Sequence, residues 1–410
     1  MNPLLPEEYC IPDAEAHAFG GRLYLYGSMD IPGHNDYCSD RYHVFSTDDM
    51  VHWTDHGISC RREGELLYAP DCMAADGRYY LYYCTNRFEE RVAASERPEG
   101  PFTDIGIIGR ACDSIDPAVF ADEDGRCYFY WGQFQLRGAQ LAADRVSLLP
   151  ETLNTSLIDE YAHGFHEGAS VRRRGDWYYL VYTDISRGKA TCLSYAMSRS
   201  PLGPFEKQGV IVDNIGCDPC TWNNHGSIGE FDGRWYVFYH RSSRNSHVSR
   251  RVCAEPITFD ENGRIREVCM TTQGPEPPIP AGREVEGYRF CYGSGTACAD
   301  VPQDGGRLAC CLRRGDWAAY RYFDLPARRY TLEVCFDPPS APFTAAFSCG
   351  SFIGEYLLGR VTVDAEHTAF NLPVDFPEAM PPTGRTLYIT AEAGEGTLAF
   401  RSLCFQAISE

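Results

Sequence analysis

Long apolar runs are absent from this chain: polar or charged residues interrupt every hydrophobic stretch well before the ~20 residues that a membrane-spanning helix needs. Basic charge is also in short supply. The chain carries 37 Lys and Arg against 57 Asp and Glu, which leaves a formal net charge of −20. This acidic balance argues against nucleic acid and anionic membranes as partners, because both would repel it. We therefore expect a soluble protein whose ligand is neutral.

A basic leader is missing as well. Residues 1–8 contain no Lys or Arg and no apolar stretch of the kind found in signal peptides. Many of the 19 cysteines, such as Cys127, Cys253 and Cys335, replace apolar residues in strand patterns, as small buried thiols do. Cys217 and Cys220 form one CxxC pair, and a zinc site would need a second pair nearby, which is absent. We expect reduced cysteines and a cytoplasmic location.

No segment keeps a helical period for long. Instead, a polar turn that ends in glycine runs straight into an aromatic strand five times, with the glycines about 50 residues apart. The five glycines are Gly21, Gly77, Gly125, Gly175 and Gly233. A repeat of this length, built from hairpins of β-branched and aromatic strands, is typical of a β-propeller, in which each sheet packs against its neighbours around a channel. Five repeats predict five blades.

The length of 410 residues favours two domains. We predict an all-β protein with a five-bladed β-propeller over residues 1–272. Residues 273–281 are rich in Pro and Gly and are predicted to form a semi-rigid linker. Residues 282–410 show short strands separated by turns, which indicates a β-sandwich of the jelly-roll type.

An ionisable residue stands shortly before each of the five turn glycines. These residues are Asp13, Asp71, Asp116, Glu167 and His225. Equivalent positions in successive blades point the same way, so we expect these groups to converge at one end of the channel. Gathering carboxylates is costly because like charges repel and burial penalises them. A single Asp before a turn is usually a cap, whereas five such groups at one station indicate a functional site.

Six short motifs in this order carry a family resemblance. They are Pro12-Asp13, Tyr68-Ala69-Pro70-Asp71, Ile115-Asp116-Pro117, His166-Glu167-Gly168-Ala169, His225-Gly226-Ser227 and Tyr239-His240-Arg241. Over roughly residues 8–275 the chain resembles glycoside hydrolase family 43. The resemblance implies a five-bladed, inverting enzyme that acts on xylan, arabinoxylan and arabinan side chains or oligomers.

The resemblance also implies roles for individual residues. Asp13 would be the general base and Glu167 the general acid, while Asp116 would orient Glu167 and raise its pKa. His225 matches a family histidine in the central channel, often near a bound calcium or water, although it could also be a core histidine. No cofactor would be required for the chemistry, and a structural calcium in the channel is possible.

Three further residues are candidates for substrate binding. Asp71 would either hydrogen-bond a sugar or cap the turn at Gly77. Tyr68 could stack on a sugar ring. Arg241 follows the inner strands of the fifth repeat, and its charge could keep the Asp13 carboxyl ionised.

The C-terminal part is similar to carbohydrate-binding modules of family 6. Glu284-Val285-Glu286 matches the opening acidic pair of such modules, and Gly315-Asp316-Trp317-Ala318-Ala319-Tyr320 matches one of their strands. Where those modules end with an aspartate before an aromatic residue, this chain has Ser402-Leu403-Cys404-Phe405. The structural calcium of the module is therefore not expected here.

We predict an exo-acting, inverting glycosidase that removes xylosyl or arabinofuranosyl units from hemicellulose oligosaccharides, as a β-xylosidase, an α-L-arabinofuranosidase or both. One alternative is a retaining five-bladed enzyme that cleaves sucrose or fructan, but that class would carry a tryptophan-rich opening around the first aspartate. Another is a sugar-binding propeller without catalysis, which would lack at least one of Asp13, Asp116 and Glu167. The sequence leaves the oligomeric state open.

Overall fold

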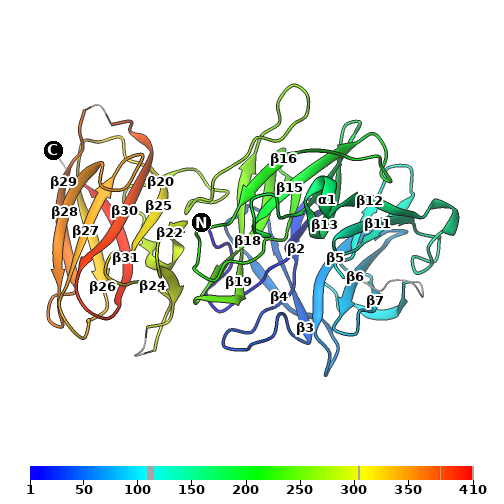
Figure 1. Ribbon diagram of the computed structural model, residues 1–410, viewed down its shortest axis with the longest axis horizontal. Coiled ribbons are helices and arrows are strands. Elements are labelled where there is room, and N and C mark those ends of the chain that lie inside the picture. Colours follow the sequence, from blue (N-terminus) through cyan, green and yellow to red (C-terminus); the bar gives the residue numbers. More distant parts are fainter. Residues whose placement is uncertain (109–114, 303–304, 379, 409–410) are drawn as a thin grey trace.

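The computed structural model describes residues 1–108, 115–302, 305–378 and 380–408. It is an all-β structure: five antiparallel sheets arranged as a propeller precede a β-sandwich (Figure 1). The predicted fold class is confirmed. The α-helix α1 (Glu160–His163) and the 3-10 turns η1 (Pro150–Thr152) and η2 (Gly287–Arg289) are short. No helix among the described residues has the length and hydrophobicity needed to cross a membrane.

Each blade is an antiparallel meander in which strands follow chain order. The first two blades contain β1 (Glu15–Phe19), β2 (Arg22–Tyr26), β3 (Arg41–Thr47), β4 (Thr54–Arg61), β5 (Leu67–Ala75), β6 (Arg78–Thr85), β7 (Glu90–Ser95) and β8 (Thr103–Ile107). The next two contain β9 (Ala118–Ala121), β10 (Cys127–Trp131), β11 (Gln135–Gln140), β12 (Asn154–Asp159), β13 (Phe165–Arg174), β14 (Trp177–Asp184), β15 (Cys192–Ser198) and β16 (Glu206–Asp213). The fifth contains β17 (Ser227–Phe231), β18 (Arg234–Ser243) and β19 (Ser246–Ile257).

The turn between the first two strands of a blade explains the glycine repeat. In the second blade Asp76 and Gly77 have φ of 52° and 74°, and in the fifth Asp232 and Gly233 have φ of 50° and 72°. Two consecutive positive φ angles define the type I′ hairpin turn, which Asp-Gly favours because its twist matches that of the strands. A Cβ at either glycine would meet no atom within 4 Å, so the backbone angle, not space, requires glycine.

The innermost strands form a closed ring around the channel. In order, β1, β5, β9, β13 and β17 each contact the next, and β17 returns to β1. The first residues of the chain close this ring from outside, because Leu4 N–H donates to Val252 O (2.9 Å) on the free edge of β19. The Asn2 side chain accepts from Ala254 N–H (2.9 Å) and donates to Ala254 O (3.0 Å) on the same edge. The N-terminal segment thus pairs with the fifth blade, whose sheet has only three strands.

The sandwich packs two sheets over a core that includes Tyr320, Phe347 and Phe400. One sheet contains β20 (Ile279–Pro280), β22 (Tyr292–Gly293), β25 (Trp317–Asp324), β27 (Phe343–Cys349), β28 (Tyr356–Val363) and β30 (Thr383–Ala393). The other contains β21 (Val285–Glu286), β23 (Cys298–Asp300), β24 (Ala309–Leu312), β26 (Arg329–Phe336), β29 (Ala369–Asp375) and β31 (Leu398–Ala407).

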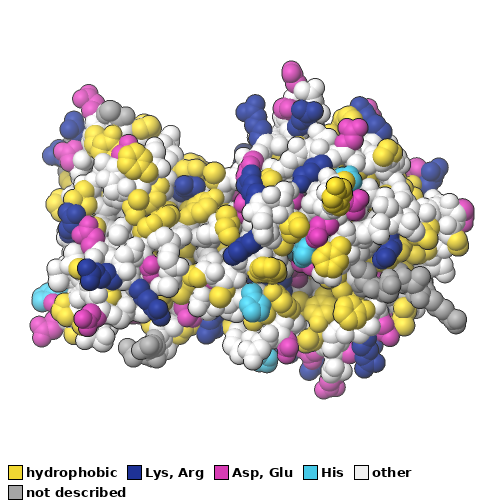
Figure 2. Space-filling model, viewed as in Figure 1, with side chains coloured by type: hydrophobic (Ala, Val, Ile, Leu, Met, Phe, Trp, Pro, Cys, Tyr) yellow, Lys and Arg dark blue, Asp and Glu magenta, His cyan; other side chains and the backbone are white. Residues whose placement is uncertain are grey.

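The two domains are joined by direct hydrogen bonds. Thr272 N–H and Gln273 N–H both donate to Arg321 O of the sandwich (2.6 and 2.9 Å), and Arg244 N–H donates to Ala299 O (2.7 Å). Residues 279–280, within the stretch predicted as a linker, form strand β20 of the sandwich. Figure 2 shows two lobes with a notch between them at one edge and acidic and basic side chains interspersed over this face. The connection is therefore a packed seam instead of a free tether.

Candidate active site

One pocket of about 470 Å³ gathers most of the predicted site residues. Asp13, Asp116, Glu167 and His225 line it, and so does Tyr68. Each of the first four stands at or just before an innermost strand, so the propeller's repeat brings them to one end of the channel. This placement agrees with the convergence predicted from the sequence.

Asp13 is buried on one wall of the pocket, in the residue pair that leads into β1, with a φ of 57°. Its Oδ1 accepts a hydrogen bond from Arg250 Nη1 at 3.1 Å. Burial alone would raise the pKa of Asp13, but the charge of Arg250 holds the pKa below its ordinary value. Asp13 is therefore ionised near neutral pH, as a general base must be.

The prediction that Arg241 provides this charge is wrong. Arg241 is buried at the seam, where its Nη2 donates to Thr271 O (2.7 Å) and to the Tyr239 hydroxyl (2.7 Å). It does not line the pocket. The β-strand alternation explains the error: Arg241 on β18 points away from the channel toward Glu255 (3.4 Å), whereas Arg250 on β19 points toward Asp13.

Asp116 stands just before β9, and Glu167 lies on the neighbouring inner strand β13. Asp116 Oδ2 accepts a hydrogen bond from Gly168 N–H at 3.1 Å, so it holds the peptide that follows Glu167. The pKa of Asp116 is raised well above its usual range by burial and by the charges of Glu167 and Asp13. Asp116 therefore keeps its proton to higher pH than an isolated carboxyl would.

A bulge in β13 aims the Glu167 side chain. The pairing of β13 with β14 shifts register on both sides of Glu167, and Gly168 has a φ of 61°. A Cβ at Gly168 would lie 2.8 Å from the His225 ring, so only glycine fits there. Gln133 Nε2 donates to Glu167 Oε2 (3.0 Å) and Asn223 Nδ2 donates to Oε1 (3.3 Å).

Two histidines flank the base. His225 Nδ1 lies 3.7 Å from Asp13 Oδ1 and 4.0 Å from Asp116 Oδ2, and burial lowers the pKa of His225. His240 is wholly buried, with Nδ1 3.8 Å from Asp13 Oδ1 and Nε2 3.0 Å from Asn223 O. Burial and the charge of Arg250 lower the pKa of His240 to about 3, so its ring is neutral. A neutral ring must donate from Nε2 to the carbonyl, which leaves Nδ1 facing the base.

Asp71 is fully buried and does not line the pocket. Its Oδ1 pairs with His17 Nε2 (2.7 Å), and its Oδ2 accepts from Val119 N–H (2.8 Å). The structure thus contradicts both roles predicted for it, since it neither faces the pocket nor caps the turn at Gly77. A register shift between Tyr68 and Asp71 in β5 explains the difference, because a bulge re-aims the side chains that follow it.

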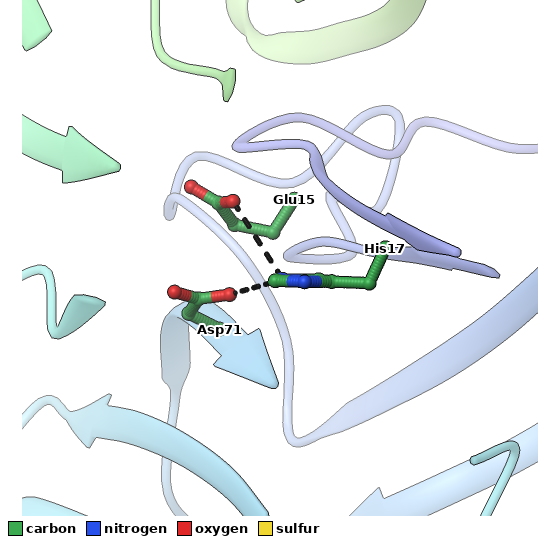
Figure 3. Close-up of side chains that lie close together, drawn as sticks. All are labelled: Glu15, His17 and Asp71. Carbon is green, nitrogen blue, oxygen red and sulfur yellow. Dashed lines mark hydrogen bonds and ion pairs between the residues drawn. The ribbon is translucent and has the colours of Figure 1, made fainter. Parts of the chain in front are cut away.

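Glu15, His17 and Asp71 form a group that could hold a metal ion: one ligand atom from each lies within 4.8 Å of the others (Figure 3). The positively charged guanidinium of Arg172 already lies against this group. Arg172 Nη2 lies 2.6 Å from Glu15 Oε2 and 3.1 Å from His17 Nε2. A metal between these side chains would meet the guanidinium at close range, so the group does not fit a metal while Arg172 is present.

Aromatic side chains surround the pocket mouth. Trp222 and Phe88 line it and expose 53% and 58% of their surface. Tyr68 is half-buried in the wall, which leaves its predicted stacking role open, and Tyr37 covers the Arg250 guanidinium at 4.8 Å. Exposed aromatic faces beside a polar pocket suit sugar rings, whose C–H faces pack on them.

Sequence reasoning missed Arg250, Gln133 and Asn223, all of which line the pocket. None of them occupies the repeated station before a turn glycine, so the repeat could not point to them. Asn223 stands two residues before His225, and this proximity was the one available signal.

Comparison with known proteins agrees with this geometry. Residues 1–265 match the family described as Glycosyl hydrolases family 43. The chain belongs to that family. A xylosidase/arabinosidase of Thermoclostridium stercorarium is 33% identical over 343 residues, which cover 71% of each chain. Xylosidase/arabinosidase 43A of Humicola insolens is 32% identical over 65% of this chain and 98% of its own.

Solved structures of family 43 proteins extend the comparison. The β-xylosidase/α-arabinofuranosidase CoXyl43 from a compost metagenome, in a calcium-free form with xylotriose, is 30% identical, with a TM-score of 0.58 over 65% of this chain and 97% of its own. An arabinoxylan arabinofuranohydrolase from Bacillus subtilis covers 99% of this chain and 97% of its own, at 22% identity and a TM-score of 0.58. That second likeness shows that a family 43 propeller followed by a further domain is a shared fold.

Proposed function

We propose that the protein is an exo-acting, inverting glycosidase that removes xylosyl or arabinofuranosyl units from plant hemicellulose oligosaccharides. The observation that carries the proposal is the pairing of opposite proton states in one pocket. Asp13 is held ionised by Arg250, while burial and the charges of Glu167 and Asp13 raise the pKa of Asp116, so that Asp116 retains a proton. Relatives about one third identical are xylosidase/arabinosidases, which supports the substrate class.

The chemistry needs two proton transfers. Asp13 accepts a proton from a water molecule as that water attacks the anomeric carbon, and Glu167 donates a proton to the departing glycosidic oxygen. The anomeric carbon–oxygen bond breaks as the new one forms on the opposite face, so the configuration inverts. The enzyme is then reset when Asp13 releases its proton to solvent and Glu167 takes one up.

A sugar-binding propeller without catalysis is the second candidate, and it is less well supported. Such a protein has no need for an ionised Asp13 and a protonated Asp116 in one pocket, because burying either group costs free energy. All three carboxyl groups line the pocket here. A retaining enzyme would use one carboxylate as a nucleophile, and its product would keep the anomeric configuration of the substrate.

A structural calcium in the channel is a separate proposal. Asp13 Oδ1 already accepts from Arg250, and Asp116 Oδ2 already accepts from Gly168 N–H, so His225 Nδ1 would be the protein ligand. Calcium prefers six to eight oxygen ligands, and water would supply most of them. Bound there, the ion would supply positive charge to the channel and not a reacting group. Thermal unfolding with calcium and with a chelator tests this: a bound ion predicts a lower Tm after chelation.

We also propose a cytoplasmic location, where the enzyme would meet imported oligosaccharides. All cysteines in the described part of the chain are free, which suits a reducing compartment. Cell fractionation tests the location.

A panel of nitrophenyl glycosides tests the substrate class. The proposal predicts turnover of the β-xyloside, the α-L-arabinofuranoside or both, with none on a β-glucoside. Activity confined to a hexoside, or absent on the whole panel while the oligosaccharides also stay intact, would contradict it.

A further inference from the structure

Asn223 connects the two sides of the pocket. Its backbone carbonyl accepts from His240 Nε2 (3.0 Å), beside the base, while its side-chain Nδ2 donates to Glu167 Oε1 (3.3 Å). The same carbonyl accepts from Asn214 Nδ2 at 2.9 Å, and the next residue, Asn224, donates its N–H to Ala190 O (2.7 Å). The backbone of Asn223 is thus fixed from three directions, so its side chain is held on a rigid support.

Only Nδ2 of the Asn223 side-chain amide has a hydrogen-bond partner among the described residues. The residue is 8% exposed, and its Oδ1 is buried with no hydrogen-bond partner among the described residues. A buried acceptor without a partner is destabilising, so its presence beside the carboxyl group of Glu167 calls for a reason. Gln133 already serves the other oxygen of Glu167.

A general acid alternates between two hydrogen-bonding states. As a carboxylate, Glu167 accepts from an N–H donor, whereas the protonated form carries an O–H that must donate. A half-turn of the Asn223 amide exchanges Nδ2 and Oδ1 at nearly unchanged shape. The unused Oδ1 would then accept from a protonated Glu167. Neither an apolar residue nor an aspartate at this position could serve both states.

We propose that Asn223 is a positioning residue for the general acid, and that its amide holds Glu167 in both protonation states by turning between donor and acceptor. The inference rests on the proposed function for the role of Glu167. The amide itself exchanges no proton: the proton leaves Glu167 for the glycosidic oxygen and returns from solvent. Asn223 only keeps the carboxyl group at one position throughout.

Two variants of the full-length protein test the kinetic consequence. Asn223→Ala should lower kcat on xylobiose about 10- to 100-fold, because a loosened acid spends less time in line with the leaving oxygen. The loss on a nitrophenyl xyloside should be several-fold smaller, because that leaving group needs little protonation. Asn223→Asp should move the basic limb of the pH–rate profile to higher pH, since a carboxylate next to Glu167 would repel its negative charge and favour the protonated form. Asn262→Asp, in an exposed turn, is the matched control and should change none of these.

A readout without substrate separates this inference from the proposed function. Protein labelled with ¹³C at the glutamate carboxyl carbons has one resonance that disappears in Glu167→Gln, and its titration can be followed by NMR. Asn223→Asp should shift that titration to higher pH, and the Asn262→Asp control should not. An unmoved titration, or equal losses by Asn223→Ala on both substrates with an unchanged pH profile, would overturn the positioning role. Wild-type protein inactive on all pentosides would overturn the proposed function, and the NMR titration would still decide the role of Asn223.

Discussion

Arg250 joins two buried aspartates, one in the pocket and one behind it. Its Nη1 donates to Asp13 Oδ1 at 3.1 Å, while its Nε and Nη2 each donate to a different oxygen of Asp30 at 2.9 Å. The bidentate pair with Asp30 fixes the plane of the guanidinium and hence where its charge meets the base. The ionised state of Asp13 therefore depends on a residue from the far end of the propeller sequence.

Replacing Arg250 should alter both stability and pH dependence. Arg250→Met leaves Asp30 buried without its partner, so the free energy of unfolding should fall by about 3–5 kcal/mol in denaturant titrations. Without the guanidinium the pKa of Asp13 should rise, because burial then dominates. The base is active only when ionised, so the acidic limb of kcat/KM should move to higher pH.

Two companion variants identify which arginine matters. Arg250→Lys keeps a positive charge and should shift the acidic limb less than Arg250→Met. Arg241→Met should destabilise the seam through Glu255 but leave the acidic limb where it is. If Arg241→Met moved the acidic limb and Arg250→Met did not, Arg241 and not Arg250 would be the residue that keeps Asp13 ionised.

Glu167→Gln tests the general acid. The glutamine keeps the shape but cannot protonate a leaving oxygen, so hydrolysis of xylobiose should fall by about 10²- to 10⁴-fold. Nitrophenyl xyloside should be spared much more. Glu151→Gln, at an exposed turn, serves as the control. Equal losses on the two substrates would remove Glu167 from that role.

Asp116→Asn tests the proton-holding pair. Burial and the charges of Glu167 and Asp13 raise the pKa of Asp116 well above its usual range. Replacing Asp116 removes the repulsion between the two carboxylates, so Glu167 should ionise at lower pH in the variant. The basic limb of the pH–rate profile should therefore move down by about one unit or more. A basic limb that stays in place in this variant would show that the pairing has no effect on catalysis.

Arg172→Met tests the claim that the Arg172 guanidinium takes the position that a metal ion would hold among Glu15, His17 and Asp71. The variant leaves Glu15 and Asp71 close together with only His17 between them. Burial and the charge of Asp71 raise the pKa of Glu15 to about 8, and losing Arg172 should raise it further. The destabilisation should be larger at pH 8 than at pH 5, where Glu15 is protonated.

Calcium should raise the Tm of the variant more than that of the wild type. If calcium raised the Tm of the variant and of the wild type equally, Arg172 would not be the group that keeps a metal ion out of this site.

The sandwich domain should stabilise the propeller more than it anchors polymer. Truncation after Pro280 removes the partners of Arg244 and Gln273 at the seam and should expose apolar surface, lowering Tm and solubility. We expect residues 282–410 alone to bind insoluble xylan negligibly. Strong xylan retention by that fragment, together with full activity of the truncated propeller, would favour an ordinary tethered binding module.

The sequence predicted the blades and most of the pocket because both follow from a repeat. The turn glycines set the hairpins, and the residues before them reached the same end of the channel. Asp71 failed because a bulge in β5, invisible in the repeat, turned it into the channel. Arg250 was missed because its contact with Asp13 spans 237 positions and closes the ring, which no local pattern encodes. Asn223 was missed because its contact with Glu167 joins residues 56 positions apart, and its place near His225 was the one local signal.

The stereochemistry of xylobiose hydrolysis tests the central claim most directly. With an ionised base and a proton donor in one pocket, water attacks opposite the leaving group. Early time points by ¹H NMR, before mutarotation, should show the newly released reducing sugar as α-xylose. Early accumulation of β-xylose would reveal a retaining mechanism and contradict the roles assigned to Asp13 and Glu167.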